Sequence, residues 1–404
     1  MNIAMVSEHA SPLAVLGGVD AGGQNVHVAE LSAALVRAGY RVAVYTRRDD
    51  ELLPRSVTMP SGVTVVHVDA GPARNVAKDE LLPYMDALAR GLRRAFIHAP
   101  PDVVHGHFWM SGRAALAACK PLGIPVVQTF HALGSEKRRM QGVSDTSPRE
   151  RLAEEARIMR TADRVIATSS SEIFELCRLG ADAHRLKIVP CGVDAAFFTR
   201  PEGALPLMRR RTFRVVTLSR LVARKGVDDV IAALRDVPDA ELIVAGGPAP
   251  AELARDAEAQ RLAGHARSCG VADRVMFLGR IERDDVPRLL RAADAVVCAA
   301  WYEPFGIVPL EAMASGVPVV ATAVGGQNDT VIDRFTGLHV APREPGAIAA
   351  ALRELFADGG LRARLGAAGQ RRAHARFTWD RIAAETATVY RALARAPEAV
   401  SHTA

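Results

Sequence analysis

The segment FRVVTLSRLVARKGVDDVIAALRDVPDAELIVAGG (residues 213–247) predicts a strand, a helix and a second strand in succession. Its apolar runs at 213–219 and 240–247 have the length of buried strands, and Gly226 opens the helical pattern between them. Strands that are apolar throughout and are joined by helices are typical of a parallel sheet with helices on both faces. The segment therefore predicts an α/β fold.

The same alternation continues in both directions from this segment. Further strands are predicted at 3–7, 41–46, 63–68, 102–107, 124–130, 164–169 and 186–190 before it and at 274–279, 295–300, 318–322 and 336–340 after it. Helical patterns occupy intervals such as 25–37, 79–98 and 379–394. The predicted fold class is α/β, with two Rossmann-like parallel-sheet domains that face a cleft.

The two sets of strands are separated by a stretch at 199–211 that contains two prolines and a glycine. A chain of 404 residues is long enough for two domains of this kind. We therefore predict an N-terminal domain at 1–200, a C-terminal domain at 201–377 and a last helical segment at 378–404 that packs back on the N-terminal domain. Ligands of such sheets bind beyond the carboxyl ends of the strands, so two facing domains share one binding cleft.

Composition narrows the classes of protein. The first residues read as a strand and not as a secretory signal, and no apolar run is long enough to span a membrane, so a cytoplasmic protein is expected. The five cysteines form no Cys-x-x-Cys pair, which fits free thiols. The net charge of +6 would attract phosphate-bearing small molecules, an anionic membrane face or nucleic acid. Nucleic acid is not an expected partner, because aromatic residues make up only 5% of the chain and no basic helix carries them. Whether the chain forms a homodimer stays open.

A glycine-rich loop follows the first strand and holds Gly17, Gly18, Gly22 and Gly23 before a helix that begins near Gln24. Glycines let the backbone approach a ligand closely, and a helix start offers free N–H groups to an anion. The loop is thus a candidate phosphate cradle, with a flexible connection as the alternative. Its spacing is not G-x-G-x-x-G, which argues against a dinucleotide-dependent oxidoreductase.

Two cations follow the strand at 213–219. Arg220 lies just past its end, and Lys225 precedes the helix that Gly226 opens. Cations at a strand-to-helix loop suit a diphosphate, whose charge grows as a sugar–phosphate bond breaks. A chance surface pair is the alternative.

The segment WYEPFGIVPLEAMASGVPVVATAVGG (301–326) carries two glutamates eight residues apart, Glu303 in a loop and Glu311 in a helix that starts around Ile307. The loop glutamate can reach sugar hydroxyls and the helical one can reach ribose hydroxyls. The helix start offers N–H groups to phosphates. A glycosidase also uses two carboxylates, but this mixture of loop and helix fits the binding of a nucleotide sugar better.

These motifs together resemble family 4 glycosyltransferases over nearly the whole chain. The Glu-x7-Glu segment, the Arg…Lys pair and the GGxxxGG loop carry the resemblance. The pieces SEHASP, GGVDAGGQNVHV, HGHFWMSG, TFHALGSEK and VPCGVD are similar to the group that contains sucrose-phosphate synthase and the mycothiol-pathway inositol-phosphate glycosyltransferases. The resemblance implies a GT-B fold whose N-terminal domain binds the acceptor and whose C-terminal domain binds the nucleotide sugar.

It also implies a retaining, metal-independent transfer from a nucleotide diphosphate sugar, a UDP-sugar or a GDP-sugar, to a small polar sugar or cyclitol, phosphorylated or not. The sequence contains no Asp-x-Asp, the pattern with which metal-dependent transferases hold a divalent ion, and no other cofactor is expected. Transfer would proceed by front-face displacement. The alternatives are a nucleotide-sugar binder without catalysis and an epimerase or phosphorylase on the same scaffold.

The resemblance assigns residues to three sets. The catalytic set is His131, Arg220, Lys225 and Glu303. The donor set adds Gly22, Gly23, Arg280, Phe305, Gly306, Ile307, Val308 and Glu311. The acceptor set is Asp20, Asn25, Lys78, Phe108, Lys137 and Arg151, and no residue is assigned to a metal. His105 and His107 share one face of a strand end, a spacing that could chelate zinc, but no third ligand is apparent, so cleft lining or core packing is expected.

The acceptor set departs from the mycothiol-type pattern at two positions. Those enzymes carry Tyr where this chain has Phe108 and Thr where it has Ala132. Two hydroxyl donors to a phosphate are therefore missing, each worth roughly 1 kcal/mol or more. This argues against inositol phosphate as the acceptor, whereas Lys78, Lys137 and Arg151 favour an anionic one.

Overall fold

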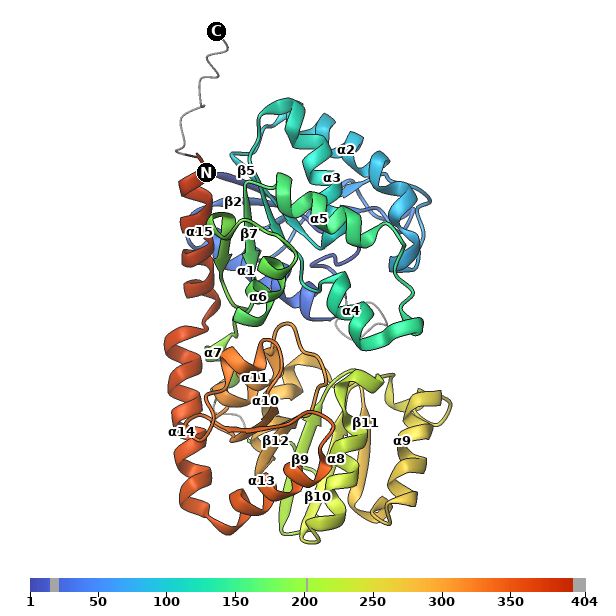
Figure 1. The fold of residues 1–404 in the computed structure, drawn as a ribbon, viewed down its shortest axis with the longest axis vertical. Coiled ribbons are helices and arrows are strands. Elements are labelled where there is room, and N and C mark those ends of the chain that lie inside the picture. Colours follow the sequence, from blue (N-terminus) through green and yellow to red (C-terminus); the bar gives the residue numbers. More distant parts are fainter. Residues whose placement is uncertain (15–21, 201–202, 395–404) are drawn as a thin grey trace.

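The computed structural model describes residues 1–14, 22–200 and 203–394. Gly17, Gly18, Asp20, part of the predicted linker and the end of the segment 378–404 lie outside the described residues. Figure 1 shows two α/β domains, one above the other, with the last two helices running along the side of both. Each domain is built on one sheet, which confirms the predicted fold class. Among the described residues, no helix has the length and apolar character needed to cross a membrane.

The N-terminal domain contains an eight-stranded sheet in the order β3-β4-β2-β1-β5-β6-β7-β8. Its strands are β1 (Asn2–Val6), β2 (Arg41–Arg47), β3 (Ser56–Thr58), β4 (Thr64–Val68), β5 (Val103–His107), β6 (Val126–Thr129), β7 (Arg164–Ala167) and β8 (Leu186–Ile188). Its helices are α1 (Gly23–Arg37), α2 (Met85–His98), α3 (Trp109–Cys119), α4 (Gly134–Gln141), α5 (Arg151–Thr161), α6 (Ser170–Arg178) and α7 (Ala195–Phe198). The central strand β1 pairs in parallel with β2 on one side and with β5 on the other.

The C-terminal domain contains a six-stranded parallel sheet in the order β11-β10-β9-β12-β13-β14. Its strands are β9 (Phe213–Leu218), β10 (Ala240–Ala245), β11 (Val275–Gly279), β12 (Ala295–Cys298), β13 (Val319–Thr322) and β14 (Leu338–Val340). Its helices are α8 (Val227–Ala233), α9 (Ala257–Ser268), α10 (Val286–Arg291), α11 (Ile307–Ala314), α12 (Gln327–Thr330), α13 (Pro345–Ala357) and α14 (Gly359–Arg376), and α15 (Trp379–Ala394) follows. Every strand predicted from the sequence is present.

Two local features differ from the prediction. The short strand β3 pairs antiparallel with β4 at the edge of the sheet. It was not predicted, because its three residues are mostly exposed and form no apolar run. The helix predicted at 79–98 begins only at Met85, after two short 3-10 turns at Lys78–Glu80 and Leu82–Tyr84. Pro83 lies in the second turn, where its missing N–H does not interrupt a helix that starts after it.

Helix α15 completes the core of the N-terminal domain. Trp379, Ile382 and Tyr390 are buried in the same apolar cluster as Ile3 and Val28. The Tyr390 hydroxyl also lies 2.6 Å from Nδ1 of the buried residue His105. The chain thus returns from the second domain to the first through a single long segment, α14 and α15, seen as the red helices in Figure 1.

We predict that Trp379→Ala lowers the free energy of unfolding by about 3–5 kcal/mol, the usual cost of truncating a large core aromatic. Trp379 is 3% exposed, and a Cβ at Gly192 would lie 2.5 Å from its ring, so the site is closely packed. Urea denaturation followed by circular dichroism measures the change. Arg381→Ala, on the exposed face of the same helix, serves as the control and should cost less than about 0.5 kcal/mol. Equal losses in the two variants would contradict the packing described here.

Candidate active site in the interdomain cleft

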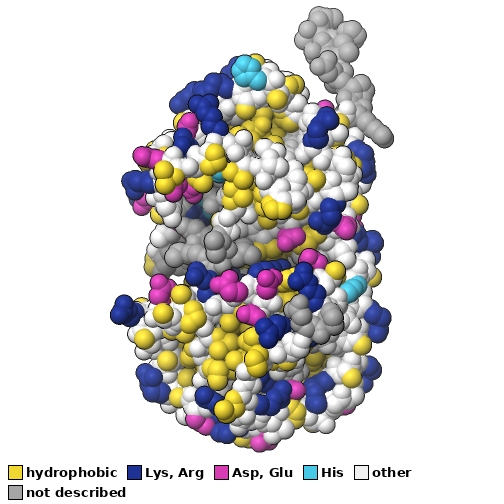
Figure 2. All heavy atoms as spheres, turned by 180° about the vertical axis from the view of Figure 1, so that it is seen from behind, with side chains coloured by type: hydrophobic (Ala, Val, Ile, Leu, Met, Phe, Trp, Pro, Cys, Tyr) yellow, Lys and Arg dark blue, Asp and Glu magenta, His cyan; other side chains and the backbone are white. Residues whose placement is uncertain are grey.

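One cavity of about 450 Å³ lies between the domains and is lined by both. It opens beyond the carboxyl ends of strands such as β5, β6 and β9, where parallel sheets bind their ligands. Acidic and basic side chains gather along the junction of the two domains on the face seen in Figure 2. Fifteen of the predicted site residues line the cavity: Gly22, Gly23, Asn25, Lys78, Phe108, His131, Lys137, Arg151, Arg220, Lys225, Glu303, Phe305, Ile307, Val308 and Glu311.

A buried ion pair stands at the centre of the C-terminal wall. Lys225 ends a 3-10 turn that follows β9, and its ammonium group donates to the carboxylate of Glu303, which follows β12. Burial would raise the pKa of Glu303, but the nearby cations Lys225 and Arg224 outweigh burial and lower this pKa to about 2. Glu303 is therefore a carboxylate at neutral pH. It can accept a hydrogen bond from a hydroxyl while it holds Lys225 in place.

The loop that carries Glu303 rests on the glycine pair at 325–326. The Gly326 N–H donates to the Glu303 carbonyl at 2.8 Å. Gly325 has φ +50°, and a Cβ there would collide with the same carbonyl. Larger residues at this turn would displace Glu303, which explains the glycines in the sequence.

Helix α11 begins at the cavity. Gly306 is its N-cap residue and adopts φ +70°, a conformation that favours glycine. Ile307 and Val308 line the cavity in the first turn, where N–H groups have no partner within the helix. The helix start can therefore receive an anion. Glu311, one turn further on, lines the cavity and forms an ion pair with Arg283, a partner that the sequence did not indicate.

Three predicted residues stand apart from this lining. Gly306 caps α11 but is not among the lining residues. Arg280 follows β11, where its backbone N–H donates to the Pro248 carbonyl at 2.8 Å, and it does not line the cavity either. Asp20 lies outside the described residues. Arg283, three positions after Arg280, is the arginine that reaches Glu311.

The glycine-rich loop brings the N-terminal domain close to the C-terminal wall. A Cβ at Gly23 would lie 3.0 Å from the Phe305 ring, and a Cβ at Gly22 would lie 4.0 Å from the Arg220 guanidinium carbon. The side chain of Asn25 accepts a hydrogen bond from the Gly22 N–H at 3.1 Å and so fixes the start of α1. A side chain at Gly23 would therefore require the Phe305 ring to shift, whereas Gly22 has room for a Cβ.

Histidines form a buried group that reaches the cavity through His131. His131 has φ +62°, and its Nε2 lies 2.9 Å from Nδ1 of His107. Burial, followed by the neighbouring histidines, lowers the pKa of His131 and His107 well below the ordinary value, and burial lowers the pKa of His27 to about 4. These imidazoles are neutral at pH 7. Among the described residues, no group of three or more His, Cys, Asp or Glu side chains is arranged to hold a metal ion.

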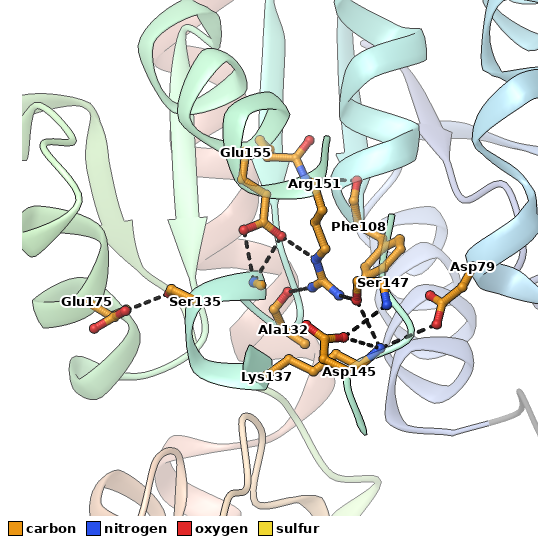
Figure 3. A network of polar contacts seen from close by, with 12 residues as sticks. Asp79, Phe108, Ala132, Ser135, Lys137, Asp145, Ser147, Arg151, Glu155 and Glu175 are labelled. Atoms are coloured by element: carbon orange, nitrogen blue, oxygen red, sulfur yellow. Dashed lines mark hydrogen bonds and ion pairs between the residues drawn. The ribbon is translucent and has the colours of Figure 1, made fainter. Parts of the chain in front are cut away.

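The N-terminal wall contains the predicted acceptor residues. Phe108 is buried with φ +79°, a strained conformation for a bulky residue, and its ring faces the cations of Lys78 and Arg151 at 5.8 and 5.1 Å. Lys137 and Arg151 belong to a network of ion pairs and hydrogen bonds, drawn in Figure 3. The cavity thus has a cationic C-terminal wall and an N-terminal wall with a mixed surface of charges and an aromatic ring.

Sequence reasoning missed several lining residues, among them His9, Gln24, Met140, Gln141, Arg224 and Tyr302. Arg224 and Tyr302 adjoin Lys225 and Glu303 in sequence, and Arg224 donates to the Tyr302 carbonyl at 3.1 Å. Arg224 could have been predicted, because it adjoins Lys225, a cation already assigned to the site. Met140 and Gln141 end α4, and no pattern in the sequence indicated that this helix reaches the cavity.

Comparison with known proteins assigns the family. Residues 21–197 match the family model described as Glycosyltransferase Family 4, and residues 208–372 match the model described as Glycosyl transferases group 1. The chain belongs to glycosyltransferase family 4. Both matches lie within the two domains described above, and together they include nearly all of the cavity lining.

Individual relatives of this family 4 glycosyltransferase cover almost its whole length. It is 38% identical to the D-inositol 3-phosphate glycosyltransferase of Xylanimonas cellulosilytica, with 96% of each chain covered, and 37% identical to that of Salinispora tropica, with 96% of this chain and 84% of the relative covered. Among solved structures, sucrose-phosphate synthase from Thermosynechococcus elongatus has a TM-score of 0.88 and 30% identity over 97% of this chain and 98% of the other. These similarities confirm the predicted GT-B glycosyltransferase and its subgroup.

We predict that the protein loses stability as the pH falls below 6.5. His27 has a folded-state pKa of about 4, below its unfolded value, so unfolding takes up a proton between these values and stability present at pH 7 is lost in acid. Each such buried histidine contributes up to about 1.4 kcal/mol per pH unit. Urea denaturation at pH 7, 6 and 5 measures the slope. His27→Gln should reduce it, the control His184→Gln on the surface should not, and a slope unchanged in both variants would argue against the buried neutral imidazole.

Proposed function

We propose that this glycosyltransferase moves a sugar, with retention of anomeric configuration, from a nucleotide diphosphate sugar to a small sugar or cyclitol. The observation that supports this most directly is the C-terminal wall, where Arg220, Lys225 and the start of α11 surround one end of a shared cavity. Cations and helix-start N–H groups are the chemistry that binds a diphosphate. The donor would be a UDP-sugar or a GDP-sugar. The solved Anabaena HepE structure in complex with UDP-glucose, at 23% identity and a TM-score of 0.74, shares the fold.

Each wall residue has a role in this proposal. Arg220 binds the diphosphate, and Lys225 mainly neutralises the charge that develops on the diphosphate as it leaves. Glu303, an ionised carboxylate beside Lys225, accepts hydrogen bonds from the hydroxyls of the transferred sugar. Glu311 accepts from the ribose hydroxyls, with Arg283 holding its carboxylate in position.

The transfer proceeds by front-face displacement. The bond from the anomeric carbon to the diphosphate oxygen breaks, and the bond from that carbon to the acceptor oxygen forms on the same face. The proton of the acceptor hydroxyl passes to the departing phosphate oxygen. Arg220 and Lys225 stabilise the leaving diphosphate in the role that a divalent cation has in metal-dependent transferases, so the reaction needs no metal.

His131 positions the sugar in this mechanism. Its pKa lies well below the ordinary value because the side chain is buried, so it enters the reaction as a neutral imidazole. A neutral ring can donate one hydrogen bond and cannot supply a full positive charge. This limits its contribution to orientation and hydrogen bonding, and leaves charge stabilisation to Arg220 and Lys225.

The acceptor is proposed from the N-terminal wall together with the relatives. The curated relatives are named for D-inositol 3-phosphate, and the most similar structure reported above is a sucrose-phosphate synthase. Both names point to small polyhydroxylated acceptors. The cavity of about 450 Å³ has the size of a site for small molecules.

We predict that Lys225→Ala lowers kcat on the order of a hundredfold with little change in donor binding, because the cation acts mainly as the diphosphate leaves. Glu311→Ala should raise the Kd of the nucleotide sugar on the order of tenfold. Kinetics of nucleotide release and calorimetry of donor binding measure the two effects. Lys187→Ala and Glu354→Ala, which remove the same charges elsewhere, should behave like the parent. Parental transfer rates in both site variants would refute the donor assignment.

Two further measurements test the reaction class. A thermal-shift panel should show stabilisation by one nucleoside diphosphate and its sugar, since a ligand of the folded state stabilises it by mass action. Transfer at the full rate in excess EDTA is expected. Loss of turnover that added magnesium restores would overturn the metal-independent mechanism. Nucleotide released at the same rate without any acceptor would indicate a hydrolase or an epimerase.

A further inference from the structure

Two of the three cations of the acceptor wall, Lys137 and Arg151, are already paired with carboxylates inside the protein. Figure 3 shows the Lys137 side chain pointing toward oxygen atoms of Asp79, Asp145 and Ser147. Its ammonium nitrogen lies 3.1 Å from Asp145 Oδ1, 3.4 Å from Asp79 Oδ2 and 2.9 Å from Ser147 Oγ. An ammonium group has three donors, and these three acceptors match them in number. A phosphate could bind Lys137 only by displacing a partner or by approaching these carboxylates.

Arg151 is also bonded within the protein, through Nε and both terminal nitrogens. Its side chain is 3% exposed; its Nε donates to Glu155 Oε1 at 2.8 Å, and its terminal nitrogens donate to the Ala132 carbonyl at 2.6 Å and to Ser147 Oγ at 3.1 Å. Glu155 in turn accepts from the Gly134 N–H, the first residue of α4, at 2.9 Å. This carboxylate is therefore anchored by the fold and cannot turn away from Arg151.

The charges in this wall balance. Asp145 has a side chain that is 6% exposed; burial would raise its pKa, but hydrogen bonds from Ser147 and the cation Lys137 lower it. Asp79 has a lowered pKa for similar reasons, with hydrogen bonding from Thr146 and the charge of Lys137 outweighing burial. Burial raises the pKa of Glu155, and the charge of Arg151 opposes this. Three carboxylates, Asp79, Asp145 and Glu155, thus face the three cations Lys78, Lys137 and Arg151, so much of the positive charge of the wall is offset before a phosphate arrives.

What remains open toward the cavity is partly apolar. Phe108, Ala132 and Met140 line the same wall, and the ring of Phe108 lies against the cation of Arg151 at 5.1 Å. The ring also lies 5.8 Å from the Lys78 ammonium group, and it puts an apolar surface beside the cations, with no hydroxyl donor for a phosphate. The uncharged amides of Gln24 and Gln141 also line the cavity, whereas both polar atoms of Asn25 are bonded to Gly22 and Ser11.

We propose that this wall selects an uncharged polyhydroxylated acceptor over its phosphorylated counterpart, and that Asp145 and Glu155 are the residues that set this preference. The inference rests on the proposed transfer function and specifies its acceptor. It reverses the expectation from the sequence, where Lys78, Lys137 and Arg151 favour an anionic acceptor. That expectation rested only on the presence of these cations in the sequence. In the structure, the carboxylates paired with Lys137 and Arg151 offset positive charge in the wall.

The test compares acceptors in matched pairs: inositol with inositol 3-phosphate, glucose with glucose 6-phosphate, and fructose with fructose 6-phosphate. For the pair that the parent uses, kcat/KM for the neutral member should exceed that for the phosphorylated member at least about tenfold. Asp145→Asn keeps the Oδ1 atom that binds Lys137 and the Ser147 N–H, but removes the charge. It should shift the ratio toward the phosphorylated member on the order of tenfold.

Asp86→Asn is the matched control, because it removes one carboxylate charge from an exposed ion pair with Arg113 outside the cavity. Its ratio should equal that of the parent. A parent that prefers the phosphorylated acceptor, or an Asp145→Asn ratio that matches the control, overturns the inference and leaves the transfer function intact. Absence of donor binding and of nucleotide release with every acceptor would instead refute the proposed function.

A binding measurement tests the wall independently of turnover. Calorimetry with inorganic phosphate, in the presence of saturating nucleoside diphosphate, should show no binding by the parent at millimolar phosphate and a gain of binding in Asp145→Asn. Phosphate binding by the parent that Lys137→Ala abolishes would show that the cations are available to an anion. That result would overturn the inference.

Discussion

The structure of the interdomain cleft depends on the buried ion pair between Lys225 and Glu303. Two loops from different strands meet in this pair, and neither charge has enough water around it to be stable alone. The glycine turn at 325–326 supports the backbone of Glu303, and the start of α11 follows two residues after Phe305. The position of the helix N-terminus, the orientation of the lysine and the charge of the glutamate are therefore one structural unit.

The strands and helices could be predicted from the sequence, because the residues that mark each element lie within it or next to it. Apolar runs mark the strands, and Gly306 and Gly23 mark helix starts, since each of these signals lies within a few residues. Strand β3 could not be predicted, because its pairing with β4 is a tertiary contact and its three residues form no apolar run.

The residues of the candidate site also divide into those with a local signal in the sequence and those without one. Residues in motifs, such as Lys225 and Glu303, could be assigned from the sequence and are brought together by the structure. Their partners could not, because Asp145 meets Lys137 only after the loop behind α4 folds over it, and Arg283 meets Glu311 from a separate helical turn. Charge in a sequence shows which groups are present. Only the fold shows which of them neutralise one another.

The packing of α15 on the N-terminal domain affects the order in which the two domains can complete their cores during synthesis. The sheet of the second domain is encoded without interruption between residues 213 and 340, whereas the core of the first includes side chains as late as Tyr390. A ribosome delivers residues in order, so the domain begun earliest is the one completed last. Until the C-terminal helix emerges, the apolar surface formed by residues such as Ile3 and Val28 has no cover, and the growing polypeptide carries a binding face for its own final segment.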